Sequence, residues 1–414
     1  MERIDRRRFL GGAVAALSLG RSSLGQGAPR RMEPWCAGWL DIHHISTGRG
    51  NSVLMVCPDG TSVMIDAGAV GGTDEAMGPA RPDGSRRPGE WIGRYALRQL
   101  QTTPRQELDY FVLTHLHGDH MGDVLAASPQ SGTKGYRLTG VTDVAEAIPI
   151  RCLIDRGFPD YAYPAPTSYE GALNYMRFAK FAERHGTRVE RLKVGSARQI
   201  GLQHGASRYP GFAIQNLAAN GEVWTGRGEE TVKLFPDLGG LKPGEMPTEN
   251  ACSIALRVSS GAFRYYIGGD LTCDTRFGSQ PWMDVETAVA KVAGPVSVSA
   301  LDHHGYYDAT CPAFVRSMQS RVYVMQTWHA SHPALSVLDE LYSPVLQAGA
   351  RDVFATGLVA AAELAEARLA DKMLSQRGHV VIRVAEGGGS FEVFVVDDAR
   401  EDGDLLRRWG PYRS

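Results

Sequence analysis

The chain has 414 residues, of which 43% are hydrophobic and 22% are charged, which is an ordinary composition for a globular protein with a large core. Its formal net charge of −2 excludes a global electrostatic attraction to nucleic acid. The 6 cysteines are scattered without a C-x-x-C pair, so no cysteine zinc motif is predicted and most are expected to be small buried side chains.

Residues 1–28 are typical of an export signal. Arg6, Arg7 and Arg8 precede Phe9-Leu10 and a short apolar run that ends near residue 20. A basic start followed by such a run predicts a secretory signal, and the arginine pair resembles a twin-arginine signal, which exports folded proteins. The apolar run is too short to span a bilayer comfortably. We expect a periplasmic or secreted protein without stable membrane association after cleavage of the signal.

The mature chain opens with strands predicted over residues 39–45, 53–56 and 61–65. The last of these strands ends in Asp66-Ala67-Gly68, and a helix is predicted over residues 91–100. His43 and His44 fall inside the first strand. We expect them to pack within the fold, with a place at the mouth of a site as the alternative.

The stretch from residue 108 to 123 organises the rest of the chain. A short apolar run, 110–113, predicts a buried strand, and it ends in His115, His117, Asp119 and His120. Ligands at a strand end lie on a loop that a rigid sheet holds in place. Gly118 lets the chain bend between the two pairs. This order suits two adjacent metal ions, one held by His115 and His117 and the other by Asp119 and His120. A helix is expected over residues 121–127.

A long segment, about 128–248, separates these residues from the next motifs. It contains a predicted helix over residues 169–185 and a basic stretch, 177–208, that is either a solvated surface or a rim that attracts an anionic substrate. Beyond it, strands are predicted over 263–267, 296–301, 322–325, 380–384 and 391–396, and helices over 282–293 and 357–376.

His115-Leu116-His117-Gly118-Asp119-His120 resembles the signature of the metallo-β-lactamase fold hydrolases. The resemblance implies an αββα four-layer sandwich over residues 35–414, with the segment 128–248 as an insertion between the second and third motifs. It also implies a site for one or two metals at one edge. Asp66 would support that site by binding a ligand histidine. Asp270, after Gly268-Gly269, matches the bridging carboxylate. The last ligand would be His303, by its offset from Gly305, or its neighbour His304.

Several details resemble the hydrolase domain of the competence protein ComEC. They are the strand-turn-strand opening, Glu249-Asn250, His303-His304-Gly305 and His332-Pro333. Asn250 stands where the wider family usually has a third histidine. The first metal site would then be weaker, would use Asn250 or water as a ligand, or would be filled only with substrate. His332 would bind substrate or donate a proton.

The implied chemistry is hydrolysis by a metal-bound hydroxide. Zinc is the default ion and manganese the alternative, because imidazole and carboxylate ligands suit both. Asp119 and Asp270 would orient the hydroxide and take its proton. We expect a phosphodiester substrate, either nucleic acid or a phosphocholine-type ester. The alternatives are a lactamase or lactonase that attacks a carbonyl, and an exported metal-binding protein without catalysis.

Overall fold

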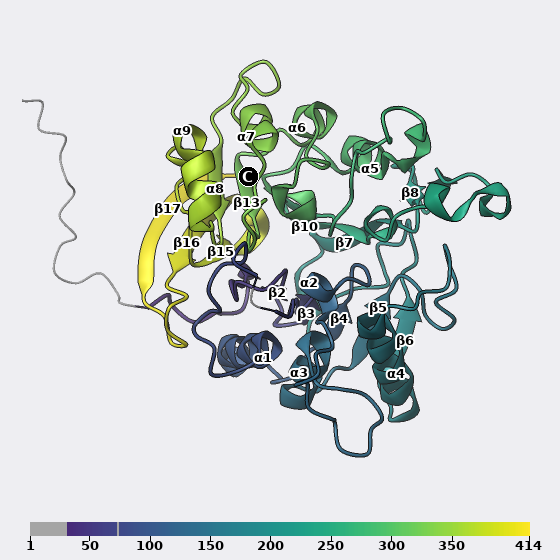
Figure 1. Cartoon of the computed structure of the whole chain (residues 1–414). Coiled ribbons are helices and arrows are strands. Elements are labelled where there is room, and N and C mark those ends of the chain that lie inside the picture. Colours follow the sequence, from purple (N-terminus) through teal and green to yellow (C-terminus); the bar gives the residue numbers. More distant parts are fainter. Residues whose placement is uncertain (1–30, 73) are drawn as a thin grey trace, which may run out of the picture. The chain divides into compact units, whose positions relative to one another are not determined.

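The computed structural model describes residues 31–72 and 74–414, and the predicted signal, 1–28, lies outside them. Two large sheets dominate the described chain (Figure 1). The first sheet has nine strands in the order β17 (Leu405–Arg413), β16 (Ser390–Val396), β15 (His379–Val384), β1 (Leu40–His44), β2 (Val53–Val56), β3 (Ser62–Ile65), β4 (Tyr110–Val112), β5 (Cys152–Asp155) and β6 (Arg188–Arg191). The second has eight, in the order β14 (Asp352–Ala355), β13 (Val322–Met325), β12 (Val298–Ala300), β11 (Phe263–Ile267), β10 (Ala255–Ser260), β7 (Phe212–Ala219), β8 (Glu222–Trp224) and β9 (Thr231–Lys233).

The α-helices of the described residues cover the outer faces of these sheets (Figure 1). They are α1 (Pro88–Gln99), α2 (Gly118–Met121), α3 (Gly140–Ala147), α4 (Glu170–Arg184), α5 (Val285–Ala293), α6 (Pro312–Met318), α7 (Leu335–Leu341), α8 (Ala360–Ala365) and α9 (Ala367–Ala370). Three short 3-10 turns matter for the site or its surroundings, namely η5 (Asn250–Cys252), η6 (Pro281–Met283) and η7 (Asp302–Gly305).

Three apolar cores separate four layers. Side chains of a strand alternate between its two faces, and strand β2 shows the consequence. Val53 and Met55 join the core between the two sheets, whereas Leu54 and Val56 join the core under α1, α3 and α4. A third core lies between the second sheet and helices α5, α6 and α7. The layers therefore run helix, sheet, sheet, helix, and the predicted αββα sandwich is confirmed.

Parallel strands make up one side of each sheet and carry the site residues at their ends. Strands β3, β4 and β5 are parallel neighbours in the first sheet, and β11, β12 and β13 are parallel neighbours in the second. Functional residues in such sheets gather beyond the carboxyl ends of the strands. Here Asp66 follows β3, His115 follows β4, and Asp270 follows β11.

Most predicted strands and the helix at 170–184 agree with the structure, but two predicted helices differ and several strands were not predicted. The helix expected over residues 121–127 is wrong, because helix α2 begins at Gly118 and ends where Gly122 adopts a φ of 101°. The long helix expected over 357–376 is replaced by the short helices α8 and α9, after which Leu374 donates a backbone hydrogen bond to Val353 of β14. Strands β5 to β9, β14 and β17 were not predicted.

The segment 128–248, expected as an insertion, contributes to both sheets. It supplies β5 and β6 to the first sheet and β7, β8 and β9 to the second, and β7 pairs along its length with β10. The segment is therefore built into the sandwich.

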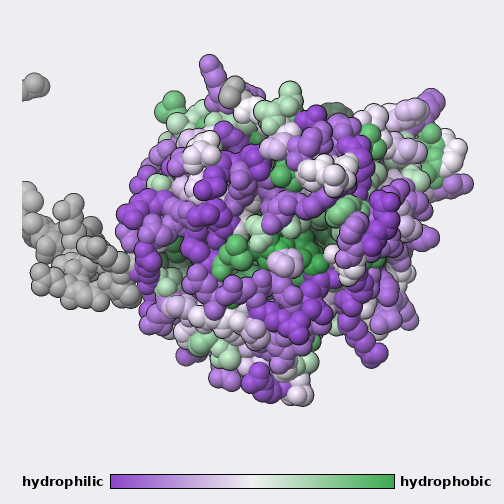
Figure 2. Space-filling model, turned by 90° about the horizontal axis from the view of Figure 1, so that it is seen from below, coloured by the Kyte–Doolittle hydropathy of each residue, from purple (hydrophilic) through white to green (hydrophobic). Residues whose placement is uncertain are grey.

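The surface seen from below the view of Figure 1 is mostly hydrophilic, with an apolar hollow near its middle (Figure 2). Among the residues that the structure describes, none of the helices has the length and apolar character that crossing a membrane requires.

Candidate metal centre

The turn that carries most of the predicted ligands is pinned by backbone hydrogen bonds from neighbouring strand ends. Asn51 donates its N–H to the carbonyl of Asp119 at 2.8 Å, and Ala67 donates to the carbonyl of His120 at 2.8 Å. The approach is so close that a Cβ on Gly68 would lie 1.9 Å from the carbonyl oxygen of Asp119. A glycine is required at this point, and the turn is held before any ligand arrives.

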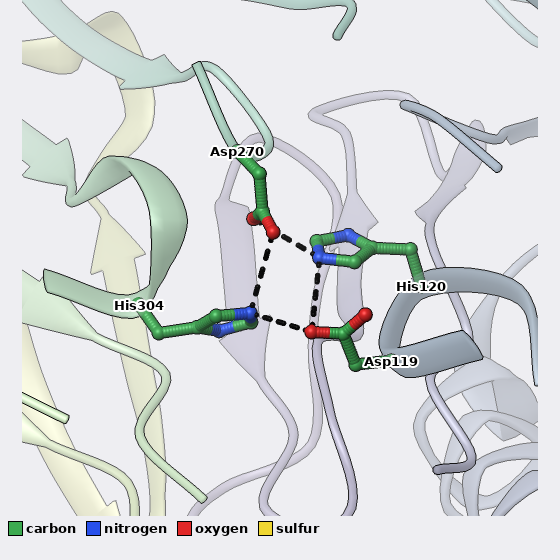
Figure 3. Close-up of side chains that lie close together, drawn as sticks. All are labelled: Asp119, His120, Asp270 and His304. Carbon is green, nitrogen blue, oxygen red and sulfur yellow. Dashed lines mark hydrogen bonds and ion pairs between the residues drawn. The ribbon is translucent and has the colours of Figure 1, made fainter. Parts of the chain in front are cut away.

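Four of the predicted residues form a compact group at the seam between the two sheets (Figure 3). Asp119 and His120 come from helix α2, Asp270 from the loop after β11, and His304 from η7. His304 Nε2 lies 2.9 Å from Asp119 Oδ2, and His120 Nε2 lies 3.0 Å from Asp270 Oδ1. Donor atoms at such spacings can share one metal ion.

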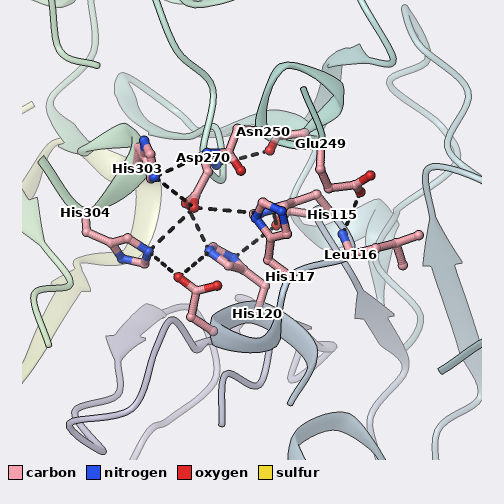
Figure 4. Close-up of polar contacts among 12 residues, drawn as sticks. His115, Leu116, His117, His120, Glu249, Asn250, Asp270, His303 and His304 are labelled. Atoms are coloured by element: carbon pink, nitrogen blue, oxygen red, sulfur yellow. Dashed lines mark hydrogen bonds and ion pairs between the residues drawn. The ribbon is translucent and has the colours of Figure 1, made fainter. Parts of the chain in front are cut away.

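A second, smaller group shares Asp270 (Figure 4). His115 Nε2 lies 3.1 Å from His117 Nδ1 and 3.7 Å from Asp270 Oδ2. Asn250 borders this group at the start of η5, and its Oδ1 is buried without a hydrogen-bond partner. The two groups reproduce the predicted pairing of His115 with His117 and of Asp119 with His120, and Asp270 stands between them.

The histidines of the larger group have one ring nitrogen fixed and the other aimed at their neighbours. His120 Nδ1 donates to Asp66 Oδ2 at 2.7 Å, and His304 Nδ1 donates to the carbonyl of Gln326 at 3.0 Å. This leaves the Nε2 lone pair of each ring free for a metal. Buried His120 Nε2 and Asp270 Oδ1 face each other without hydrogen-bond geometry. Such atoms fit a cation, so the donor set fits the divalent metal that the fold implies.

Asp66 lies where the sequence predicts a supporting carboxylate. It follows β3 with a φ of 60°, and its Oδ1 accepts the backbone N–H of Thr114 at 2.8 Å. Its Oδ2 accepts from the Thr114 hydroxyl, at 2.8 Å, and from His120. One side chain therefore ties the end of β3 to the loop after β4 and sets the tautomer of His120.

Charge concentrates in the buried site. Burial disfavours the charged form of His120, but Asp270, Asp119 and Asp66 outweigh it and raise the pKa of His120 well above its ordinary value. The same competition raises the pKa of His304 to about 9, through Asp270 and Asp119. Burial works against ionised Asp270, yet His120 and His304 hold the pKa of that carboxyl well below its usual range. The ionised form of Asp270 is therefore favoured, which suits a site for a cation.

The two neighbouring histidines of η7 turn to different partners. His303 and His304 have φ values of 44° and 58°, in the left-handed region that non-glycine residues rarely adopt. His304 enters the larger group, whereas His303 Nε2 lies 3.2 Å from Asn250 Nδ2 and 3.8 Å from Asp270 Oδ2. His303 Nδ1 is held by Asp308 Oδ1 at 2.6 Å. His303 thus borders the smaller group, on the side of Asn250.

The remaining histidines of interest lie at different depths. His332 stacks on His304 with ring centroids 4.7 Å apart, and its Nδ1 is buried without a partner. His43 and His44 pack against Tyr95 and Tyr265 inside the sandwich. His204 contacts Asp109, at 3.1 Å, away from the ligand groups.

Glu249 and Arg156 support the ligand loop and were not singled out from the sequence. Glu249 Oε1 accepts the backbone N–H of Leu116 at 2.8 Å and a hydrogen bond from Arg156 Nε at 2.6 Å. Arg156 follows β5 and is buried. The pair fixes the loop between His115 and His117. Glu249 precedes Asn250 directly, but nothing in the spacing to Arg156 indicates the contact.

A cavity of about 470 Å³ opens beside the ligands. Its lining combines ligand residues with apolar, aromatic and acidic side chains, namely Val70, Leu116, His117, Gly118, Asp119, Asp123, Thr167, Tyr169, Glu249 and Trp328. Within the described chain, no lysine or arginine lines it. The basic stretch 177–208 instead contributes His185, Arg188 and Gln203 to another cavity.

Comparison with protein families gives one match. Residues 46–140 match the family model described as the metallo-beta-lactamase superfamily. The matched stretch holds Asp66, His115, His117, Asp119 and His120, whereas Asp270, His303 and His304 lie beyond it. No curated protein matches the chain. The finer resemblance to ComEC therefore stays a prediction. Residues 46–140 are therefore similar to the metallo-beta-lactamase superfamily, and the four-layer sandwich is consistent with that fold.

Proposed function

We propose that this protein is a metal-dependent hydrolase that cleaves a phosphodiester bond in a small ester. The observation that carries the proposal is the pair of ligand groups that share Asp270 beside a cavity. His115, His117 and Asp270 would hold one ion, and Asp119, His120, Asp270 and His304 the other. Zinc is the proposed ion, with manganese as the alternative. A bound ion of this kind lowers the pKa of a water molecule to about 7 and polarises the oxygen that it contacts.

The protein side chains have distinct proposed roles. Asp119 lines the cavity, and although burial opposes its ionisation, His120 and His304 hold its pKa well below the ordinary value. It can therefore orient the attacking water and accept its proton. Asp270 stays ionised between the two groups. Burial lowers the pKa of His332 well below its usual value, so its imidazole is neutral and would donate a hydrogen bond to substrate.

The residues that line the cavity favour one of the two proposed substrates, nucleic acid and a phosphocholine-type ester, over the other. A polyanion needs lysine and arginine contacts along its backbone, and none of the described residues that line this cavity supplies one. Asp123 instead adds negative charge, and Tyr169 and Trp328 add aromatic faces, whereas Glu249 is paired with Arg156. Carboxylates and aromatic rings together suit an alkylated ammonium group. The lining therefore supports a phosphocholine-type ester over nucleic acid.

The surroundings of Asn250 bear on whether a second metal ion binds. His303 is an imidazole near the smaller group, with its Nδ1 fixed by Asp308 and its Nε2 turned toward Asn250. We propose that His303 or Asn250 supports the ion held by His115 and His117. An export signal at residues 1–28 would place this chemistry in the periplasm or outside the cell.

The test compares three chromogenic substrates on the zinc-loaded and manganese-loaded mature chain. They are p-nitrophenyl phosphorylcholine, bis(p-nitrophenyl) phosphate and nitrocefin, with Asp270→Ala as the inactive control. We expect the phosphorylcholine ester to have the highest kcat/KM. Turnover of bis(p-nitrophenyl) phosphate alone would contradict the ammonium preference. Turnover of nitrocefin alone would favour carbonyl chemistry. Bound metal without turnover of any ester would favour a non-catalytic metal-binding protein.

A further inference from the structure

A second cluster of metal-binding side chains lies outside the centre already described. Cys273, Glu286 and Cys311 each place one ligand atom within 4.8 Å of the others. Cys273 lies in the loop after β11, Glu286 in the first turn of α5, and Cys311 directly before α6. Three separate elements therefore meet at two thiols and one carboxylate. We propose that this cluster is a site for one thiophilic divalent cation such as zinc, distinct from the catalytic metals.

Glu286 is buried without a compensating cation. Its exposed fraction is 0%, and in the described part of the chain it makes no ion pair with lysine, arginine or histidine. Its oxygens accept the backbone N–H groups of Thr310, at 2.5 Å, and Cys311, at 3.1 Å, and the carboxyl of Asp302 lies beside it. Burial and the neighbouring carboxyl of Asp302 raise the pKa of Glu286 well above its ordinary value. A bound cation would remove this cost.

Asp302 is a second buried carboxyl, and it lies beside Glu286. Its side chain is 0% exposed, its Oδ2 accepts from the Tyr266 hydroxyl at 2.9 Å, and its Oδ1 has no partner. A buried, unpartnered carboxylate oxygen is costly unless a cation or proton satisfies it. The cluster itself offers two thiols and the Glu286 carboxylate, and these are ligand types that divalent zinc takes.

The thiols are held for binding and remain accessible. The backbone N–H of Cys273 donates a hydrogen bond to the carbonyl of Asp308 at 2.9 Å, and this contact fixes the position of Cys273. The Cys311 sulfur lies 3.3 Å from the Thr287 hydroxyl. Both cysteines are half-buried, so an ion can enter and a water molecule can fill a fourth position. Binding releases the thiol protons to solvent, so affinity should rise with pH.

The proposed ion would fasten the loops that carry the catalytic ligands. Cys273 follows Asp270 by three residues, and Cys311 follows His304 by seven. Asp308 connects the two loops, since its carbonyl accepts from Cys273 and its carboxylate accepts from His303. A metal here would fix the loop after β11 against η7 and α5. Its role would be structural, and its site lies outside the proposed catalysis.

Cobalt(II) loading of the full chain tests the proposal without an activity assay. The ligands of the catalytic groups include no cysteine, so a thiolate-to-cobalt charge-transfer band must come from another site. We expect the band in the wild-type chain and in Cys36→Ser, a control at an exposed cysteine. It should also persist in Asp270→Ala, which disrupts only the catalytic groups. Cys273→Ser, Cys311→Ser and Glu286→Gln should weaken or abolish it.

Metal counting gives the second readout. The reduced wild-type chain, loaded with zinc and passed over a desalting column, should retain one more zinc per chain than the Cys273→Ser/Cys311→Ser variant. Absence of the charge-transfer band from the wild-type chain would overturn the proposal even if the variants failed to fold. Discovery of a Cys273–Cys311 disulfide by peptide mapping of the native protein, with no change in zinc count on reduction, would overturn it as well.

Discussion

Two sets of histidines are buried in this protein, and their pKa values are shifted in opposite directions. At the metal centre, His120 and His304 face the carboxylates of Asp119 and Asp270, and their pKa values are raised. Inside the sandwich, His44 bonds to a tyrosine hydroxyl and His379 accepts the backbone N–H of Ser46, at 3.0 Å. Burial lowers the pKa of His44 to about 4 and that of His379 to about 3.

The difference shows that the partner, and not the depth, decides what a buried histidine does. His43 is instructive because Asp41 Oδ2 lies 3.9 Å from its Nε2. That carboxylate is already paired with Arg383, at 2.6 and 2.8 Å, and burial holds the pKa of His43 well below its ordinary value. The candidate ligands His120 and His304 instead meet carboxylates that have no arginine or lysine partner in the described part of the structure.

The largest effect is expected from removing the carboxylate that both ligand groups share. Asp270→Ala should lower kcat/KM by roughly 10²–10³-fold or more, because both metals and the orientation of the attacking water depend on it. Metal content and hydrolysis of the best substrate are the measurements, with circular dichroism to confirm the fold. Asp274→Ala, an exposed aspartate four residues on, is the matched control. Full activity of Asp270→Ala would show that the shared position is assigned wrongly.

Replacing each of the adjacent histidines of η7 by alanine should lower kcat/KM to different extents. His304→Ala removes a ligand that lies 2.9 Å from Asp119, so we expect loss of one metal and roughly a 100-fold fall in kcat/KM. His303→Ala should cost about tenfold, since His303 borders the smaller group. The two variants are compared by metal stoichiometry and kinetics. An equal or larger loss for His303→Ala would reverse the assignment.

A histidine added beside the smaller group should tighten its metal. Asn250→His would place a third imidazole next to His115 and His117, and we expect metal affinity to rise by about tenfold, or about 1.4 kcal/mol. Competition with a chromophoric chelator measures it, and Asn250→Leu is the control that keeps the volume without a donor. Unchanged affinity and stoichiometry in Asn250→His would mean that residue 250 is not the vacant ligand position.

The last prediction concerns the acid stability of the metal-free chain. His44 and His379 bind protons in the unfolded chain near pH 6.5 but not in the folded one, so the unfolded state binds more protons as pH falls toward about 4. Stability should fall by up to about 1.4 kcal/mol per pH unit for each histidine over that window. Site histidines with a raised pKa, such as His304, have the opposite effect. Their contribution to the free energy of unfolding is lost as pH rises above 6.5 toward about 9.

Urea unfolding in the presence of chelator, at intervals from pH 4 to 9, separates the two windows. His44→Gln keeps hydrogen-bonding capacity and should flatten the acid limb alone. If the acid limb kept its slope in His44→Gln, the titration would have to be assigned to other groups.

The site was largely predictable from the sequence because its residues follow strand ends within short motifs. The apolar run 110–113 places His115 to His120, and Gly268-Gly269 marks Asp270. The choice between His303 and His304 was not predictable, since left-handed backbone at both residues turns them apart. Arg156 and Glu249 are 93 residues apart, and their contact depends on how β5 packs beside β10.

The fold was predictable where strands are apolar and poorly where the backbone departs from regular structure. Four-residue runs such as 53–56 and 322–325 agree with β2 and β13. Strand β17 has mostly exposed residues and contains Gly410-Pro411, so no alternation marks it. The cysteine cluster escaped notice because Cys273 and Cys311 are far apart in sequence and meet only through the packing of α5 and α6.

The seam position of the candidate metal ligands has a consequence for how the protein holds together. Asp119 and His120 belong to the first sheet, whereas Asp270 and His304 belong to the second. An ion bound between them would cross-link the two sheets, because it cannot remain bound while the sheets separate. At free metal 1,000 times above the dissociation constant, this linkage adds about 4 kcal/mol to the free energy of unfolding. Metal supply would then govern the lifetime of the folded chain as well as its chemistry.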